Sequence, residues 1–307
     1  MKWQKKSIIV SSETLDLSWY QKNTMVPVPM LVAADRLRIF LTMCDADNVG
    51  RIGYVDVHPD HPDVVIAYSA QPVLDVGEPG FFDDSGVLPS AIFEENGRHY
   101  MFYSAYQKHE KVPYSILTGL AVFDGPDFNT LKRVSTVPLL ERTEAEQFIR
   151  SAVFCRCEAE RYTIYYSSGS SWIHNSIKEA PRYDIKCIES HDLRDWTAAM
   201  PRLCIPLKDD EYGLTTPSVF IENGVYKLYY SIRSVSKGYR LGYAESTDGL
   251  SWTRMDEKMG IEVSATGWDS EMICFGNIFK YKDKTYLFYC GNHYGMGGMG
   301  YAILEEE

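Results

Sequence analysis

The sequence predicts an all-β fold, a five-bladed β-propeller whose blades are four-stranded antiparallel sheets. An apolar strand pattern recurs along the chain, and its equivalent positions lie 62, 62, 64 and 60 residues apart. A period in this range indicates one repeated supersecondary unit. The chain also holds 22 Tyr, 13 Phe and 6 Trp, residue types that pack well on the pleated surface of strands. The equivalent positions are Arg38, Tyr100, Tyr162, Tyr226 and Tyr286.

The fourth copy of the repeat shows how one blade is built. TPSVFIE (216–222) is a strand pattern, and Asn223-Gly224 is a strong two-residue hairpin signal. VYKLYYSIR (225–233) follows as the second strand and YRLGYAES (239–246) as the third. Asp248-Gly249 then turns the chain into LSWTRM, the outer strand. The unit is therefore a four-stranded meander of about 60 residues, as in a propeller blade.

The other copies follow the same plan within one domain that spans residues 1–307. Blades are predicted to start near residues 26, 88, 150, 216 and 274. The fifth blade ends after its third strand, which leaves an open sheet edge. Residues 2–10, KWQKKSIIV, alternate polar and apolar residues. They are predicted to close the ring as the missing outer strand, and the alternative is a frayed N-terminal tail.

Composition restricts the class of function. The net charge of −11 argues against nucleic acid or an anionic membrane surface as partner. The seven Cys are odd in number and lie mostly in predicted strands, so reduced thiols and a cytoplasmic location are expected. No apolar stretch reaches the roughly 20 residues that span a bilayer. No metal-ligand spacing occurs, and no cofactor is predicted.

Function is expected at one end of the propeller axis. The segments before the first strands, and the loops between second and third strands, surround the central pocket there. Carboxylates converge from several blades, which suits a sugar site. Two carboxyls about 6.5–9.5 Å apart serve inverting hydrolysis, and about 5–5.5 Å apart they serve retaining hydrolysis. The candidate catalytic acids are Asp84, Glu211, Asp269 and Glu271.

Other residues of these segments are candidates for binding substrate. Arginines can hold a carboxylate or phosphate in a bidentate grip. Trp172 and Trp268 have no counterpart in the other blades, so they are better site candidates than repeated aromatics. The alternative for any single acid is a solvated loop position, and Asp83-Asp84 is also a plausible turn. The full set is Asp47, Arg51, Asp83, Arg150, Trp172, Arg233, Trp268, Asn292 and Tyr294.

Several segments together carry a resemblance that covers nearly the whole chain. They are DDSGVLPS (83–90), YYSSGSSW (165–172), PRYDIKCIES (181–190), YRLGYAESTDGLSW (239–252) and GWDSEMICFGNIF (267–279). The chain resembles the five-bladed β-propeller glycosidases, which include arabinanases, xylosidases, invertases and mannoside phosphorylases. It is more similar still to the glycosidase-like propellers of bacterial polysaccharide and nucleotide-sugar gene clusters. The same group includes the N-terminal domain of glucosamine inositolphosphorylceramide transferases.

The chain departs from this family at the positions of the catalytic acids. The family places an acid before each of its first three blades, whereas the first segment here reads VPVP. Leu88-Pro89 stands at the second position, with Asp84 upstream, and Arg150 stands where the third acid is expected. The family's acid and base roles therefore do not transfer residue by residue.

The resemblance implies a carbohydrate-active enzyme of the glycoside hydrolase type in polysaccharide metabolism. Its ligand would be a glycan or an activated sugar, including anionic or nucleotide-linked ones. We expect Glu211 or Glu271 to protonate the leaving oxygen and Asp84 or Asp269 to assist water, with inversion favoured over retention. The alternatives are a sugar phosphorylase or transferase, and a glycan-binding propeller without catalysis.

Overall fold

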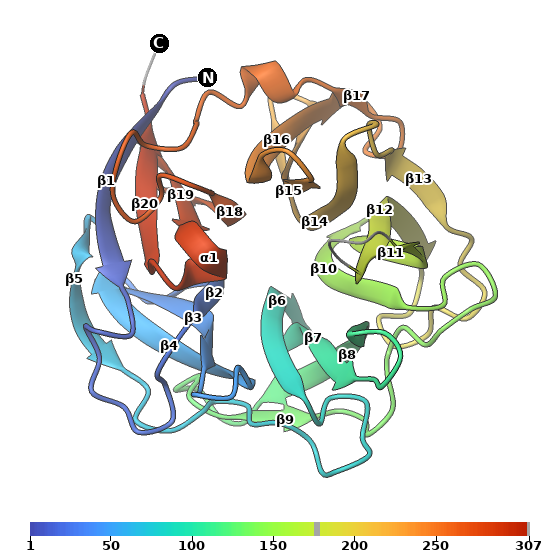
Figure 1. Cartoon of the computed structure of the whole chain (residues 1–307), viewed down its shortest axis with the longest axis horizontal. Helices are drawn as coiled ribbons and strands as arrows, with labels where there is room; N and C mark the ends of the chain where they lie inside the picture. Colours follow the sequence, from blue (N-terminus) through green and yellow to red (C-terminus); the bar gives the residue numbers. More distant parts are fainter. Residues whose placement is uncertain (175–178, 306–307) are drawn as a thin grey trace.

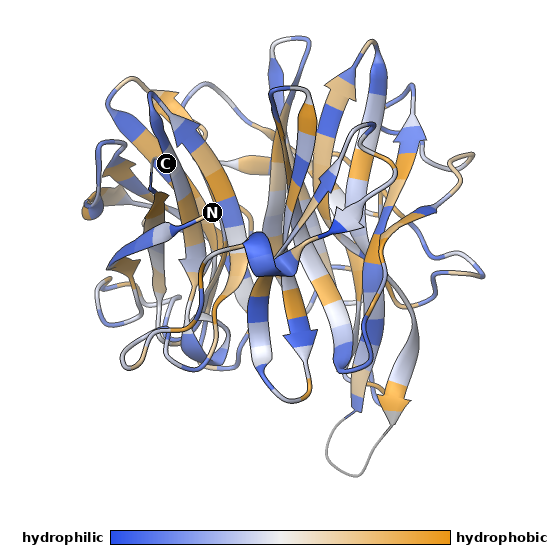
Figure 2. Cartoon of the chain, turned by 90° about the horizontal axis from the view of Figure 1, so that it is seen from above, coloured by the Kyte–Doolittle hydropathy of each residue, from blue (hydrophilic) through white to orange (hydrophobic). Residues whose placement is uncertain are grey.

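The computed structural model describes residues 1–174 and 179–305, and nearly all of its regular structure is β. Within these residues the helical elements are a 3-10 turn, η1 (Asp256–Lys258), and a single turn, α1 (Asn292–Gly295). Figure 1 shows the strands in groups around a common centre. The strands β2, β6, β10, β14 and β18 lie innermost. Figure 2 shows apolar residues concentrated along the strands.

Each copy of the sequence repeat forms an antiparallel meander. The first two meanders contain β2 (Thr24–Ala33), β3 (Arg36–Cys44), β4 (Gly50–His58) and β5 (His61–Tyr68), then β6 (Gly86–Glu95), β7 (Arg98–Lys108), β8 (Tyr114–Phe123) and β9 (Leu131–Arg133). The third and fourth contain β10 (Ile149–Glu158), β11 (Arg161–His174), β12 (Glu179–Ser190) and β13 (Arg202–Ile205), then β14 (Glu211–Glu222), β15 (Val225–Ser234), β16 (Gly238–Ser246) and β17 (Thr253–Arg254). The last contains β18 (Cys274–Tyr281), β19 (Lys284–Cys290) and β20 (Met299–Leu304).

The N-terminal strand β1 (Trp3–Val10) completes the last of these meanders. It pairs antiparallel with β20, with Trp3 opposite Leu304 and Lys5 opposite Ala302. The Trp3 indole also donates to the carbonyl of Met259, 2.9 Å away. β1 is thus the fourth strand of this sheet, next to β20.

Short parallel contacts join the middle meanders. β10 pairs with β8 at Ile149 and Ile116, and β12 pairs with β14 at Tyr183 and Gly213. These links merge three meanders into one 12-stranded sheet, and the first and last meanders are separate four-stranded sheets.

A bulge interrupts the innermost strands near the centre of the molecule. The pairing register shifts between Ser151 and Phe154 in β10, for example, and at equivalent places in the other inner strands. Ala152 has a φ of 54° there, an uncommon conformation for a non-glycine residue. Its amide donates to the Ser104 hydroxyl of the preceding meander at 2.9 Å. Bulges re-aim side chains, and here they turn short polar residues toward the centre.

Buried tyrosines in the second strands explain why a glycine stands opposite them in the third strands. Tyr103 and Tyr230 are almost completely buried. They lie opposite Gly119 and Gly242, where any Cβ would overlap the tyrosine ring. The glycine that recurs in YRLGYAES and related segments is therefore a packing requirement.

Candidate functional site

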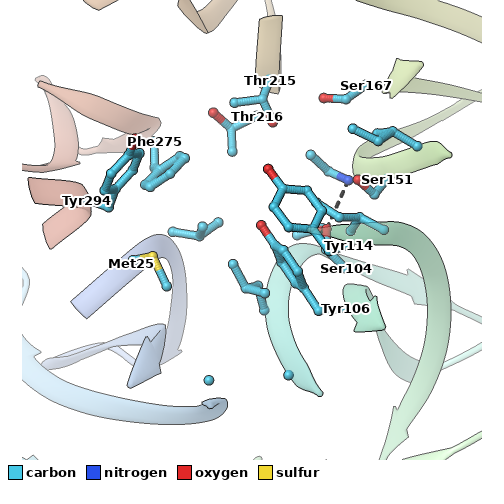
Figure 3. Close-up of a pocket in the computed structure, with 18 of the residues that line it drawn as sticks. Met25, Ser104, Tyr106, Tyr114, Ser151, Ser167, Thr215, Thr216, Phe275 and Tyr294 are labelled. Carbon is cyan, nitrogen blue, oxygen red and sulfur yellow. Dashed lines mark hydrogen bonds between the residues drawn. The ribbon is translucent and has the colours of Figure 1, made fainter. Parts of the chain in front are cut away.

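A cavity of about 520 Å³, which we call the central cavity, lies where the inner strands converge. Its wall comes from every meander, and Figure 3 shows side chains that point into it. Most polar groups of the wall are hydroxyls. They belong to Ser85, Ser90, Ser104, Ser151, Ser167, Thr215 and Thr216 and to Tyr106, Tyr114, Tyr183, Tyr239 and Tyr294.

The charged residues of the wall are cationic. Lys108 and Arg233 line the central cavity, and no Asp or Glu does so among the residues that the structure describes. Burial raises the pKa of Tyr114 to about 12 and lifts the pKa of Tyr106 and Tyr239 well above the usual range. These phenols are therefore neutral at physiological pH. They can donate hydrogen bonds to a ligand.

Arg233, near the end of β15, is held by aromatic rings. Arg233 is only 7% exposed. The guanidinium carbon lies 4.8 Å from the ring centre of Tyr212 and 5.6 Å from those of Tyr239 and Tyr294. One Nη donates to the Tyr294 hydroxyl at 3.1 Å. Cation–π contacts of this kind stabilise a partly desolvated arginine.

Two of the predicted catalytic acids form ion pairs within the protein. The Glu211 carboxylate accepts hydrogen bonds from both Nη atoms of Arg254, at 2.8 and 2.5 Å. Asp269 pairs with Lys5 at 2.7 Å and accepts a hydrogen bond from the Tyr289 hydroxyl at 2.9 Å. Both acids lie outside the wall of the central cavity. The structure therefore engages both carboxylates in contacts within the protein.

The other two predicted acids occupy loop positions. Asp84 accepts hydrogen bonds from the Gly80 amide and the Ser85 hydroxyl, at 2.9 and 2.8 Å. Its neighbour Ser85 lines the central cavity, but Asp84 itself does not. The Glu271 side chain is 60% exposed and lies 3.3 Å from His293. None of the four predicted catalytic acids lines the central cavity.

Most of the predicted binding residues also have internal partners. Asp83 pairs with Arg133 at 2.6 Å, Arg150 with Glu146 at 2.9 Å, and Arg51 with Asp45 at 2.7 Å. These contacts neutralise Arg51 and Arg150 within the protein. Neither arginine lines the central cavity. Of the three arginines predicted to bind an anionic group, Arg233 alone lines it.

Four of the remaining predicted residues do not line the central cavity. Trp172 packs edge-on against Tyr114, and Trp268 stacks on Tyr289 at 5.0 Å. Asn292 accepts a hydrogen bond from the Glu271 amide at 2.7 Å. Asp47 is exposed in the turn after β3. Of the predicted set, Arg233 and Tyr294 line the central cavity.

The buried acids belong to a repeated structural cluster. Asp83, Glu146 and Asp269 each precede or follow a turn at the start of a meander and each accept a hydrogen bond from a second-strand tyrosine. Each also pairs with a basic side chain. The tyrosines recur at one position of the repeat, directly before a small residue, in FYSAY, YYSSG and LFYCGN. The recurrence of these tyrosines is the sequence signal that could have identified Asp83, Glu146 and Asp269 as structural acids.

The cavity tyrosines were missed from the sequence. Tyr106, Tyr114, Tyr183 and Tyr239 line the central cavity, yet they resemble ordinary strand residues. Tyr183 and Tyr239 occupy equivalent third-strand positions, opposite Gly169 and Arg233, and this shared position in YDIKCIES and YRLGYAES was the signal that could have found them. Within the described ranges, no group of three or more His, Cys, Asp or Glu could hold a metal ion.

Asp184 in β12 is a half-buried acid that the sequence did not single out. Burial raises the pKa of Asp184 to about 6, although Lys186 opposes the shift. Its Oδ1 is buried without a hydrogen-bond partner. Between about pH 4 and pH 6 the folded state holds a proton that the unfolded state has released, so stability falls as pH rises through this window.

We therefore expect Asp184→Asn to remove this pH dependence. The variant should raise the free energy of unfolding at pH 7–8 by about 1–2 kcal/mol, since no charge is then buried there. Urea unfolding at several pH values between 4 and 8 measures both effects. The exposed Asp209→Asn is the matched control and should keep the wild-type slope. An unchanged slope in Asp184→Asn would contradict the assignment.

Comparisons of the sequence with known proteins find relatives of full length. No family model matches the sequence. The chain is 29% identical over 308 residues to uncharacterized protein Rv1502 and to uncharacterized protein MT1551 of two Mycobacterium tuberculosis strains, with 100% of each chain covered. No described helix has the length and apolar character needed to cross a membrane.

Solved structures of several glycoside hydrolases are similar to the chain. A thermostable family-43 glycoside hydrolase matches with a TM-score of 0.69 at 19% identity, covering 93% of this chain and 91% of that one. An alpha-L-arabinofuranosidase from Lactobacillus brevis matches with a TM-score of 0.67 at 10% identity, covering 96% and 93%. A GH43_1 enzyme from Xanthomonas citri complexed with xylotriose matches with a TM-score of 0.61 at 15% identity, covering 97% and 88%. The chain thus shares the fold of these enzymes.

Proposed function

We propose that this chain binds a carbohydrate in the central cavity, on a single five-bladed propeller domain closed by residues 2–10. The observation that carries the proposal is the wall of the central cavity, which contains both tyrosine rings and short hydroxyl side chains. Rings can pack on the apolar face of a sugar, and hydroxyls can pair with its hydroxyl groups. The cavity volume of about 520 Å³ lies within the range of about 300–1,000 Å³ that is usual for small-ligand sites.

Binding is favoured over hydrolysis by the charges of the site. Hydrolysis by two carboxylates needs both groups beside the glycosidic bond. The described wall of the central cavity holds no Asp or Glu, and Glu211 and Asp269 are engaged in ion pairs elsewhere. A glycoside hydrolase fold with this wall is well suited to hold a sugar and poorly equipped to cleave it.

Calorimetric titration with a panel of neutral and acidic saccharides, including xylotriose, tests the proposal. At least one saccharide should bind, and Tyr114→Ala should weaken it about tenfold, because an aromatic face is lost from the wall. Tyr68→Ala, on the exposed outer strand β5, is the matched control and should bind as the wild type does. If no saccharide of the panel binds, the proposal fails.

Glycoside hydrolysis remains the second candidate, and one observation favours it. Asp84 directly precedes Ser85 and Gly86, which line the central cavity. If its carboxylate reached the wall, it could assist water in an inverting reaction with Glu271 as the acid. Turnover of the bound saccharide by the wild type, lost in Asp84→Asn, would favour this candidate. Turnover that depends on phosphate would instead indicate a phosphorylase.

A further inference from the structure

The buried arginines of this protein differ in how their charge is balanced. Arg38 contacts Asp56 through two hydrogen bonds of 2.7 and 2.8 Å. Arg150 lies 2.9 Å from the Glu146 carboxylate. Arg233 is buried to a similar degree, yet it has no carboxylate within 4.0 Å among the described residues. Its Nε has no hydrogen-bond partner there either.

A buried and unbalanced charge is unfavourable unless something else compensates it. An arginine stays protonated at every physiological pH, and the neighbouring phenols stay neutral because burial raises the pKa of Tyr114 and Tyr239. The rings of Tyr212, Tyr239 and Tyr294 offset part of the desolvation through their π faces. They leave the positive charge and the Nε donor of Arg233 unmatched.

Arg233 is accessible to a ligand, because Arg233, Tyr239 and Tyr294 all line the central cavity. Figure 3 shows the Tyr294 ring on the same side of the cavity as Phe275. The Tyr294 hydroxyl accepts a hydrogen bond from Arg233, so its own proton is directed elsewhere. Lys108 adds a second cation to the wall.

We infer that Arg233 and the tyrosine hydroxyls around it bind an oxyanion, a carboxylate or a phosphate, carried by the ligand of the central cavity. A planar guanidinium fits the two oxygens of either group. This inference rests on the proposed function, since it names the class of sugar that the central cavity selects. Uronic acids and sugar phosphates, including nucleotide-linked sugars, share this chemistry.

Matched pairs of ligands test the inference in the full-length chain. The pairs are glucuronate with glucose, galacturonate with galactose, and glucose 1-phosphate or UDP-glucose with glucose, each titrated by calorimetry. One acidic member should bind about 10- to 100-fold more tightly than its neutral partner, the range expected for charge-assisted hydrogen bonds. The carboxylate and phosphate arms distinguish the two sources of the anion.

Variants identify the residue responsible. Arg233→Met should bring the acidic ligand down to the affinity of its neutral partner, and Arg233→Lys should restore part of the preference. Arg202→Met, on the exposed strand β13, is the matched control and should leave the preference for the acidic ligand unchanged. Inorganic phosphate alone, bound by the wild type and lost in Arg233→Met, would also support the inference.

The outcomes separate the two proposals. Equal affinity of the wild type for acidic and neutral partners would overturn the oxyanion site and leave sugar binding intact. A preference for acidic ligands that survives in Arg233→Met would also overturn it. Failure of every saccharide to bind would contradict the proposed function itself.

Discussion

The Glu146→Gln variant is expected to lose about 3–5 kcal/mol of its free energy of unfolding. The Glu146 side chain is fully buried, and its ion-pair partner Arg150 is 6% exposed. Glu146 also accepts hydrogen bonds from Tyr166 and Ser168, at 2.8 and 2.6 Å. The amide keeps the shape of the side chain but leaves the Arg150 guanidinium buried without a counter-charge.

Denaturant unfolding followed by tryptophan fluorescence measures this loss. The control is Glu144→Gln, two residues away and exposed, which should stay within about 0.5 kcal/mol of the wild type. A Glu146→Gln variant of unchanged stability would show that the cluster is not structural. The result bears on function, because substitution of a structural acid of this kind would lower any measured activity simply by unfolding the protein.

Arg38→Met and Arg233→Met are expected to change stability in different directions. Arg38 binds the Asp56 carboxylate and the carbonyls of Asp127 and Phe128. Its removal leaves a buried, unpaired carboxylate and should lower the free energy of unfolding by about 3–5 kcal/mol. Arg233 has no such partner in the described chain. Its replacement should leave stability unchanged or raise it.

The same denaturant unfolding, with both variants made in the wild-type background, gives the comparison. Ligand-free protein is used, because a bound anion would stabilise the wild type selectively. A loss of several kcal/mol in Arg233→Met would mean that Arg233 serves the fold in the same way as Arg38. The oxyanion site would then lose its main physical argument.

Much of the fold could be predicted because it depends on local signals. The Asn223-Gly224 turn has positive φ at both residues, as this hairpin requires. The predicted strand starts near residues 26, 88, 150, 216 and 274 fall close to the starts of β2, β6, β10, β14 and β18. The pairing of β1 with β20 gives a partner to a strand edge that would otherwise be open.

The site was harder to predict because it depends on long-range partners. Glu211 and Asp269 have the same residue types and loop setting as catalytic acids, and only their contacts with Arg254 and Lys5 reveal a different role. Those partners lie 43 and 264 residues away in the sequence. Arg233 was identified, but its significance comes from the absence of a carboxylate in the described surroundings. A sequence pattern cannot show such an absence.

The pairing of β1 with β20 has a consequence for synthesis of the chain on the ribosome. Trp3 and Lys5 leave the exit tunnel long before their partners Leu304 and Ala302 exist. At 5–20 residues per second the delay is on the order of 15–60 s. Throughout that time KWQKKSIIV is an unpaired strand with its backbone exposed to other chains. Its three lysines keep this nascent segment charged, which is a common protection against edge-to-edge aggregation.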